Sequence, residues 1–326
     1  MTLRWQPCTD MEMLARRARL LQQVRAFMAE RSILEVETPI LNRGGNPDPN
    51  IANLMVQLSL PAGEHSFYLH TSPEFAMKRL LAAGSGPIFQ IARVFRDGES
   101  GNMHEPEFSM LEWYRPGFDH HALMDEIEAL LRSLQFAGCE RVTYAEVFQH
   151  YAGLNPHQAG LAELQEKAGM LGLNLVTESR GMLLDFIFSH SVTVALGQEH
   201  PLFVYDYPAC QASLARIRSG QPDLAERFEL FISGMEIANG FNELCDSLEQ
   251  KHRFDMENEV RHQAGLPRVC IDERFLGSLV HGLPPCAGVA VGLDRLLMAL
   301  SGSKRLQDVI AFSPSRDVTG PDPIQE

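Results

Sequence analysis

Hydrophobic positions recur at helical spacing near the start of the chain. Three to four residues separate successive members of the series Leu14, Ala18, Leu21, Val24 and Met28. That spacing predicts an amphipathic helix of about 20 residues with one face buried. Thr9 and Glu12, three positions apart just before the series, predict a capping box at its start.

Further along, short extended runs alternate with helical ones. Runs bounded by turn residues predict strands at 35–41, 66–70, 88–95, 108–114, 228–241 and 288–293. Helices are expected to open at 71–74 and to cover 120–136, 247–264 and 294–300. Hairpins and loops connect most strands, so we expect an α+β fold, a mainly antiparallel sheet flanked by helices. We expect one domain over residues 1–326, with a less patterned insertion at about 140–215.

Composition narrows the class of protein. The 326 residues are 45% hydrophobic and carry a net charge of -14, which disfavours nucleic acid as a partner. There is no signal-peptide pattern and no apolar run long enough to span a membrane, so a soluble cytoplasmic protein is expected. The six cysteines form no CxxC pair, which argues against a zinc site. The sequence also has no P-loop motif.

A pair of acidic residues flanks a predicted hairpin turn. If Ser233 and Gly234 form a two-residue turn, Ile232 faces Met235 and Phe231 faces Glu236. Glu229 then shares a strand face with Phe231, and Glu229 and Glu236 become diagonal neighbours. Two such carboxylates favour a cation between them, and magnesium with substrate phosphates is one candidate. A solvated strand face is the other interpretation.

Other side chains suit a charged ligand. Glu243 follows Asn239 and Phe241, a combination that suits an ammonium group. Arg96 ends a predicted strand and Phe108 begins the next. The guanidinium of Arg96 could bind an anion, and the ring of Phe108 offers a face for stacking. Arg295 lies in the first turn of a helix after Gly292, where a phosphate would be favourable. Each feature alone also fits an ordinary surface: a solvated hairpin, or an Asp294–Arg295 pair. The segment Ser72-Pro73-Glu74, taken alone, is an ordinary helix start.

Taken in order, these segments resemble the three signature motifs of class II aminoacyl-tRNA synthetases. The first helix with EVETPIL resembles motif 1, FRDGE to HEPEFSMLEWYR resembles motif 2, and GVAVGLDR resembles motif 3. TSPE, EFSMLEWY and EIANGFNEL are similar to the lysyl branch, and the resemblance covers nearly the whole chain. The chain starts at the motif 1 helix, which implies that the anticodon-reading OB-fold domain is missing. WYRPGFD further resembles a shortened group of relatives that adenylate β-lysine and transfer it to a lysine of elongation factor P.

The resemblance implies a role for each motif position, with ATP and Mg²⁺ as cofactors. Arg96 and Arg295 are implied as the catalytic residues, and Glu229 and Glu236 as the magnesium ligands. ATP is implied to contact Arg96, Asp97, Gly98, Glu105, Phe108, Glu236, Ile237, Gly292 and Arg295. Lysine or β-lysine is implied to contact Ser72, Pro73, Glu74, Tyr114, Asn239, Phe241, Glu243 and Ala290. The resemblance also implies elongation factor P as acceptor, a homodimer through motif 1, and no tRNA or membrane partner.

Departures from the family pattern leave alternatives open. Ala290 replaces a glycine that is usual in this branch, and its methyl group could favour β-lysine over α-lysine. Glu105 replaces an asparagine, and Asn102 and Met103 replace basic residues, which weakens the expected phosphate contacts. The alternatives are an impaired relative that senses or binds lysine, a lysyl ligase with another amine acceptor, and an enzyme acting on tRNA acceptor stems alone.

Overall fold

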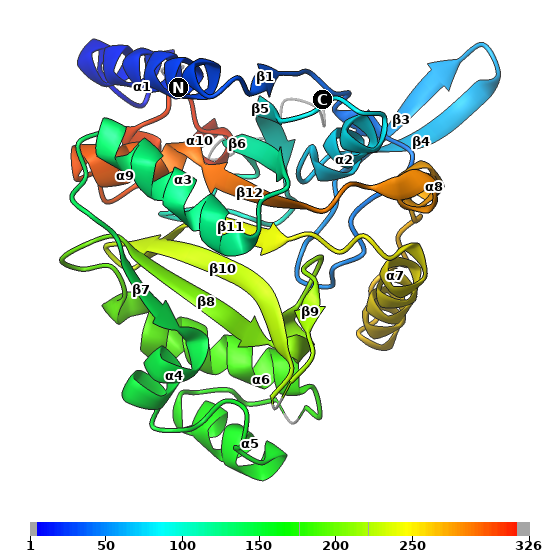
Figure 1. Cartoon of the computed structure of the whole chain (residues 1–326). Coiled ribbons are helices and arrows are strands. Elements are labelled where there is room, and N and C mark those ends of the chain that lie inside the picture. Colours follow the sequence, from blue (N-terminus) through cyan, green and yellow to red (C-terminus); the bar gives the residue numbers. More distant parts are fainter. Residues whose placement is uncertain (1–4, 176, 221, 318–326) are drawn as a thin grey trace. The chain divides into compact units, whose positions relative to one another are not determined.

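The chain folds into two compact units (Figure 1). The computed structural model describes residues 5–175, 177–220 and 222–317. The first unit contains residues up to 114, residues 246–284 and those from 290 onward, and the second contains residues 115–245 and 285–289. The predicted insertion at 140–215 falls entirely within the second unit. The expectation of one catalytic domain over residues 1–326 stays a prediction.

The first unit combines a small sheet with most of the long helices. Strands β1 and β5 pair in parallel and β5 and β6 pair antiparallel, while β2, β4 and β3 form a separate antiparallel sheet. The strands are β1 (Leu34–Glu35), β2 (Leu41–Asn42), β3 (Met55–Leu60), β4 (Gly63–Leu69), β5 (Ile88–Phe95), β6 (Glu107–Pro116) and β12 (Cys286–Gly292); β6 and β12 each run across the boundary between the units along the chain. The helices are α1 (Met11–Glu30), α2 (Glu74–Ala82), α7 (Ser247–Gln263), α8 (Glu273–Gly282), α9 (Leu293–Ser301), a 3-10 turn (Leu306–Asp308) and α10 (Pro314–Asp317).

The second unit is built on strands that follow the order β11-β10-β8-β7, with β9 beside β10. Only β7 and β8 pair in parallel, and the other pairs are antiparallel. The strands are β7 (Glu140–Thr143), β8 (Leu202–Pro208), β9 (Ile217–Arg218), β10 (Leu224–Ile232) and β11 (Met235–Asn242). The helices are α3 (His120–Ser133), α4 (Tyr144–Ala152), α5 (Leu161–Met170), α6 (Arg180–Ile187), a π-helical turn (Phe188–Val192) and 3-10 turns at Thr193–Ala195 and Ala209–Gln211.

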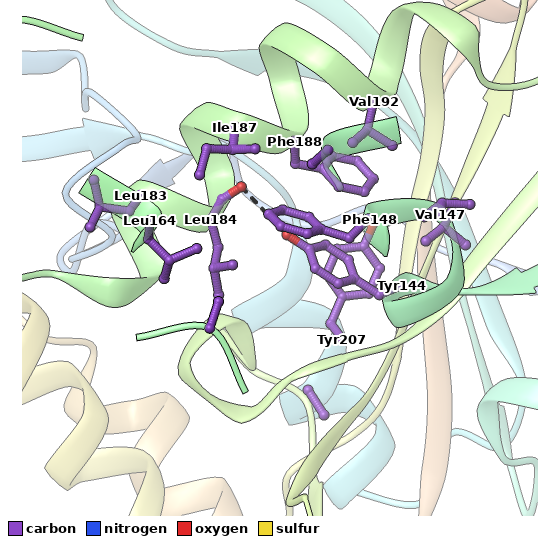
Figure 2. Packing of buried hydrophobic residues seen from close by; sticks show 14 of the residues in the cluster. Tyr144, Val147, Phe148, Leu164, Leu183, Leu184, Ile187, Phe188, Val192 and Tyr207 are labelled. Atoms are coloured by element: carbon purple, nitrogen blue, oxygen red, sulfur yellow. Dashed lines mark hydrogen bonds between the residues drawn. The ribbon is translucent and has the colours of Figure 1, made fainter. Parts of the chain in front are cut away.

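The insertion supplies most of a hydrophobic core that extends onto β10. Figure 2 shows Tyr144, Phe148, Phe188 and Tyr207 gathered among aliphatic side chains of α4, α6 and the turn that follows it. The rings of Tyr144 and Phe188 stack with centroids 4.8 Å apart. Burial of this kind contributes roughly 1.5–3 kcal/mol per large side chain. The helices of the segment therefore pack against β8, which belongs to the same segment, and against β10, and the segment is more regular than its sequence pattern indicates.

Several predicted boundaries are wrong in detail. The cap of α1 is Asp10, which accepts a hydrogen bond from the amide of Met13, whereas the hydroxyl of Thr9 donates to the carbonyl of Asp308. The strand expected at 35–41 is two short pieces, β1 and β2, in different sheets. Strands β3, β7 and β8 and helix α8 are not in the prediction, because their partners are distant in sequence or their hydrophobic pattern is weak. The α+β class with mainly antiparallel pairing is confirmed.

None of the helices in the described ranges has the length and apolar character needed to cross a membrane.

Candidate active site

The β10–β11 hairpin has the predicted register at its turn. Ile232 pairs with Met235 and Phe231 with Glu236. Ser233 and Gly234 have φ values of 52° and 74°, as the two central residues of a type I′ turn require. A β-bulge next to Phe231 then shifts the register, so that Glu229 lies opposite Asn239. The hairpin therefore holds Glu229, Glu236 and Asn239 on neighbouring positions of two strands.

Glu229 has hydrogen-bond partners that the sequence did not reveal. Its carboxylate accepts from the hydroxyl of Tyr207 at 2.7 Å and forms an ion pair with the guanidinium of Arg227. Arg227 also donates to Asn239 Oδ1 at 3.3 Å and to the carbonyl of Gln211 at 2.8 Å. Burial and the nearby charge of Glu236 raise the pKa of Glu229 to about 7, against the lowering influence of Arg227. An excess of negative charge at this hairpin is therefore only partly compensated.

This carboxylate pair fits a divalent cation bound jointly with phosphate. A cation near Glu229 would oppose both causes of its raised pKa, the burial of its charge and the repulsion from Glu236. Across the described residues, no group of three or more His, Cys, Asp or Glu side chains is arranged to hold a metal. Magnesium commonly binds one or two carboxylates and takes its other ligands from phosphates and water. Two carboxylates are thus sufficient protein ligands for that ion.

Residues that follow on β11 are tightly packed. A side chain at Gly240 would place its Cβ 2.3 Å from the ring of Phe228, so only glycine fits there. Phe241 packs against the core of the insertion, and its ring lies 5.9 Å from the guanidinium of Arg227. Glu243 is only 2% exposed, and its amide donates to the carbonyl of Cys286. A rigid backbone thus holds the Glu243 carboxylate in a buried position.

A second cluster of charges lies in the first unit, where α2 begins. Ser72 donates to Glu112 at 2.6 Å and accepts from the amide of Glu74 at 3.0 Å. The hydroxyl of Tyr114 donates to the other oxygen of Glu112 at 2.7 Å. Lys78, which is fully buried, donates to Glu74 at 2.6 Å. The predicted substrate residues Ser72, Glu74 and Tyr114 are thus brought together around Glu112.

This cluster contains more negative than positive groups. Glu112 is 2% exposed, and burial followed by repulsion from Glu74 raises its pKa to about 7. Lys78 supplies one positive charge for the two carboxyl groups, and its ammonium lies 5.8 Å from the ring of Phe275 and 6.0 Å from that of Tyr114. A further ammonium would be favourable here, because it would let both carboxylates ionise.

The β5–β6 hairpin carries Arg96 and Phe108 at the two ends of its loop. The amide of Arg96 donates to the carbonyl of Pro106, which closes the loop at its base. The guanidinium of Arg96 lies 5.1 Å from the ring of Phe108 and 3.4 Å from the carboxylate of Glu99. Phe108 and Ala290 both pack against the small cluster of Ala92, Val94 and Met110. Arg96 is thus held over an aromatic ring and forms a long ion pair with Glu99.

The two residues that open α9 have different surroundings. Asp294 is 2% exposed, pairs with Arg17 and accepts from the amide of Ser109 at 2.8 Å. Its carboxylate is therefore committed to α1 and β6, and the surface pair of Asp294 with Arg295 is not formed. Arg295 donates to the carbonyl of Met103 at 3.2 Å and contacts His104 Nε2 at 2.7 Å. Arg295 thus lies against the β5–β6 loop.

Glu105 is buried and points toward the C-terminal segment. Its carboxylate accepts from the hydroxyl of Ser313 and from both the hydroxyl and the amide of Ser315. The expectation that its charge lies close to ATP overlooked these partners, which are more than 200 positions away in sequence. Any contact of Glu105 with ATP through its backbone stays a prediction.

Sequence reasoning missed four residues of these clusters. Tyr207, Arg227, Lys78 and Glu112 each bond a predicted site residue. A signal existed for three of them, since Arg227 lies two positions before Glu229 on β10 and shares a face with it. Lys78 lies four positions after Glu74 on a helix, and Glu112 lies two before Tyr114 on a strand, so each shares a face with a predicted site residue. Tyr207 belongs to a strand that was not predicted, and no local pattern marks it.

Comparison with known proteins identifies the family. The model of the family "tRNA synthetases class II (D, K and N)" matches residues 4–316. Proteins named elongation factor P–(R)-β-lysine ligase from Haemophilus influenzae (strain PittGG), Histophilus somni (strain 2336) and Mannheimia succiniciproducens are 46%, 48% and 48% identical to the chain. These alignments cover 95%, 95% and 94% of the chain and 97% of each relative. The resemblance of the sequence motifs is thereby confirmed, and the chain belongs to the family of class II tRNA synthetases (D, K and N).

Proposed function

We propose that this protein is an ATP-dependent ligase that activates (R)-β-lysine and joins it to a lysine side chain of elongation factor P. The observation that carries the proposal is the 46–48% identity, over nearly the full length of both chains, to relatives named for that activity. The charge balance at the start of α2 supports it, since a buried pair of carboxyl groups with one lysine suits a substrate that brings an ammonium group.

In this proposal the amino acid binds through its amines. Glu74, Glu112 and Glu243 are buried or half-buried carboxyl groups, and Tyr114 and Ser72 orient Glu112 through their hydroxyls. Pro73, Asn239 and Phe241 complete the set that the resemblance implies. A hydrogen bond between a charged amine and a carboxylate is worth roughly 1.5–3 kcal/mol. Ala290 is proposed to set the choice between β-lysine and α-lysine through its methyl group.

ATP is proposed to bind through the two arginines and the β5–β6 hairpin. Arg96 would contact the α-phosphate, Phe108 would stack on adenine, and Arg295 would hold the triphosphate. Further contacts with ATP would come from the backbone of Asp97, Gly98, Ile237 and Gly292. Gly98 has a φ of 73°, which suits a tight turn near a ligand. Glu229 and Glu236 would hold magnesium, which offsets the negative charge of the phosphates when it is bound.

The chemistry needs positioning and charge stabilisation and no protein nucleophile. The carboxylate of the amino acid attacks the α-phosphorus of ATP in line, the bond to the bridging oxygen breaks, and pyrophosphate leaves. Arg96 stabilises the charge that builds on the α-phosphate oxygens. The deprotonated ε-amine of the acceptor lysine then attacks the acyl carbon, forming an amide and releasing AMP. A homodimer through the motif 1 helix is part of the proposal.

Amino-acid-dependent exchange between ATP and pyrophosphate tests the first half-reaction. We expect exchange with (R)-β-lysine to exceed exchange with α-lysine, followed by transfer of labelled β-lysine to elongation factor P. Exchange with α-lysine alone would contradict the substrate, and exchange without transfer would point to another amine acceptor. Loss of exchange with both amino acids, with lysine binding retained, would favour the lysine-binding relative, as the missing basic residues at Asn102 and Met103 suggest.

A further inference from the structure

The loop that joins β5 to β6, residues 96–106, is held along its length by residues near the end of the described chain. The hydroxyl of Ser100 donates to Ser315 Oγ at 3.0 Å, and the amide of Leu306 donates to the carbonyl of Asn102 at 2.8 Å. Arg295 contacts the next two residues, Met103 and His104. We call residues 306–315 the C-terminal latch.

The strongest contact of the C-terminal latch is with Glu105. This carboxylate is fully buried, and Ser313 is 1% exposed. The hydroxyl of Ser313 donates to one oxygen of Glu105, and the other oxygen accepts from the hydroxyl of Ser315 at 2.8 Å and from its amide at 3.2 Å. A buried carboxylate is costly unless it is hydrogen-bonded, so Glu105 depends on these donors.

We propose that Ser313 and Ser315 are positioning residues for ATP binding that act through Glu105. This inference rests on the proposed function in one respect, that the β5–β6 loop contacts ATP. A loop of this length has an ordering cost whenever a ligand needs it in one conformation. In the free protein the C-terminal latch already fixes Glu105 and Ser100, so the loop is ordered before ATP binds. Glu105 is therefore an anchor of the loop, and its negative charge is directed toward the hydrogen-bond donors of Ser313 and Ser315.

The alternative is that the C-terminal latch stabilises the fold without any bearing on ATP. The two interpretations differ in which kinetic constant responds. A positioning role raises the KM for ATP while the KM for the amino acid stays nearly constant. A purely structural role lowers the unfolding temperature and changes both KM values and kcat together.

The test is a set of full-length variants in pyrophosphate exchange: Ser313→Ala, Ser315→Ala, the double variant and Ser315→Thr. We expect the double variant to raise the KM for ATP about tenfold, equivalent to about 1.4 kcal/mol. We expect Ser315→Thr to keep most of the affinity, because it retains the hydroxyl. Ser133→Ala is the matched control, since Ser133 bonds a carbonyl of its own helix α3. An unchanged KM for ATP in the double variant would overturn the proposal, as would an equal rise in both KM values.

A second measurement keeps the test independent of the proposed reaction. Amide hydrogen exchange of residues 99–105 is compared between the unmodified protein and the double variant, both without ligand. We expect these amides to exchange at least about fivefold faster in the double variant, with α1 and β5 unchanged. If exchange is faster in the double variant but the unmodified protein shows no ligase activity, the latch orders the loop as proposed and the proposed function is rejected. Equal exchange would reject the latch whatever the activity.

Discussion

The two hairpins that carry most of the candidate site residues are held in different ways. The β10–β11 hairpin closes through a two-residue turn, so the register of Glu236 follows from residues next to it in sequence. The β5–β6 hairpin closes through a long loop, and distant residues such as Leu306, Ser313 and Ser315 hold that loop. The arrangement of the β10–β11 hairpin can be predicted from local sequence, whereas that of the β5–β6 hairpin depends on tertiary contacts. Some site residues are therefore positioned by their own strand pair, and others by contacts with distant parts of the fold.

The largest effect is expected at Glu229 on the β10–β11 hairpin. Glu229→Gln should lower pyrophosphate exchange by at least about 100-fold, because losing one preorganised electrostatic group typically costs that much. The magnesium concentration for half-maximal activity should also rise. Glu226→Gln is the matched control, since Glu226 lies on the same strand but bonds Asn242 and lies near Arg218. Full activity of Glu229→Gln would break the proposed metal role of this hairpin.

The next effect tests the return strand of the β5–β6 hairpin. Glu112→Gln should raise the KM for the amino acid about 10- to 100-fold and leave the KM for ATP nearly unchanged, because an ammonium loses its charged partner. The pKa of Glu112 is about 7, so the ionised form that binds an ammonium gains population as pH rises from 6 to 8. The KM of the unmodified protein should fall over that range, and the KM of Glu112→Gln should not follow it. A rise in the KM for ATP of equal size would contradict the assignment.

The same raised pKa has a consequence for stability. The folded protein keeps a proton on Glu112 between pH 4.5 and about 7, where the unfolded chain has released it. The free energy of unfolding therefore falls as pH rises through that window. Glu112→Gln should make this decline shallower without removing it, because the pKa values of Glu229 and Glu257 are raised too. Urea unfolding at pH 5 and pH 8 measures the change.

How far the sequence predicts the site follows from this difference between the hairpins. Glu229 and Glu236 could be placed because period two and a Ser-Gly turn determine which side chains face one another. The position of Asn239 opposite Glu229 depends on a β-bulge that this pattern does not show. Arg227 shares a strand face with Glu229 by the same period, but its ion pair with Glu229 was not predicted. Glu105 was placed near ATP by resemblance alone, and its true partners lie on a segment with no local link to it. The hydrophobic pattern predicted the α+β class, the family resemblance implied the site residues, and tertiary contacts determine where the charges point.

A smaller effect is expected at Ala290, which packs with Phe108 beside the β5–β6 strands. Ala290→Gly should raise activity on α-lysine relative to β-lysine by about 5- to 50-fold, because one methyl group at a pocket wall is worth roughly 1–3 kcal/mol. Side-by-side exchange assays with the two isomers give the ratio. Ala287→Gly, a buried alanine on the same strand β12, controls for loss of packing alone. An unchanged ratio would remove Ala290 from the selectivity of the site.

The smallest effect compares the two turns directly. Gly98 and Gly234 have nearly the same φ, 73° and 74°. Alanine at either position would therefore be destabilised by a similar backbone strain of roughly 1–2 kcal/mol. The surroundings differ, because a Cβ at Gly98 meets no atom within 4 Å, whereas at Gly234 it lies 3.2 Å from the carbonyl oxygen of Val194. Gly234→Ala should therefore lower the free energy of unfolding more than Gly98→Ala, by about 1 kcal/mol. Urea unfolding of the two variants measures the difference. Equal losses would mean that the tight turn accommodates the added methyl group as well as the open loop does. The difference between the two hairpins would then not extend to their turns.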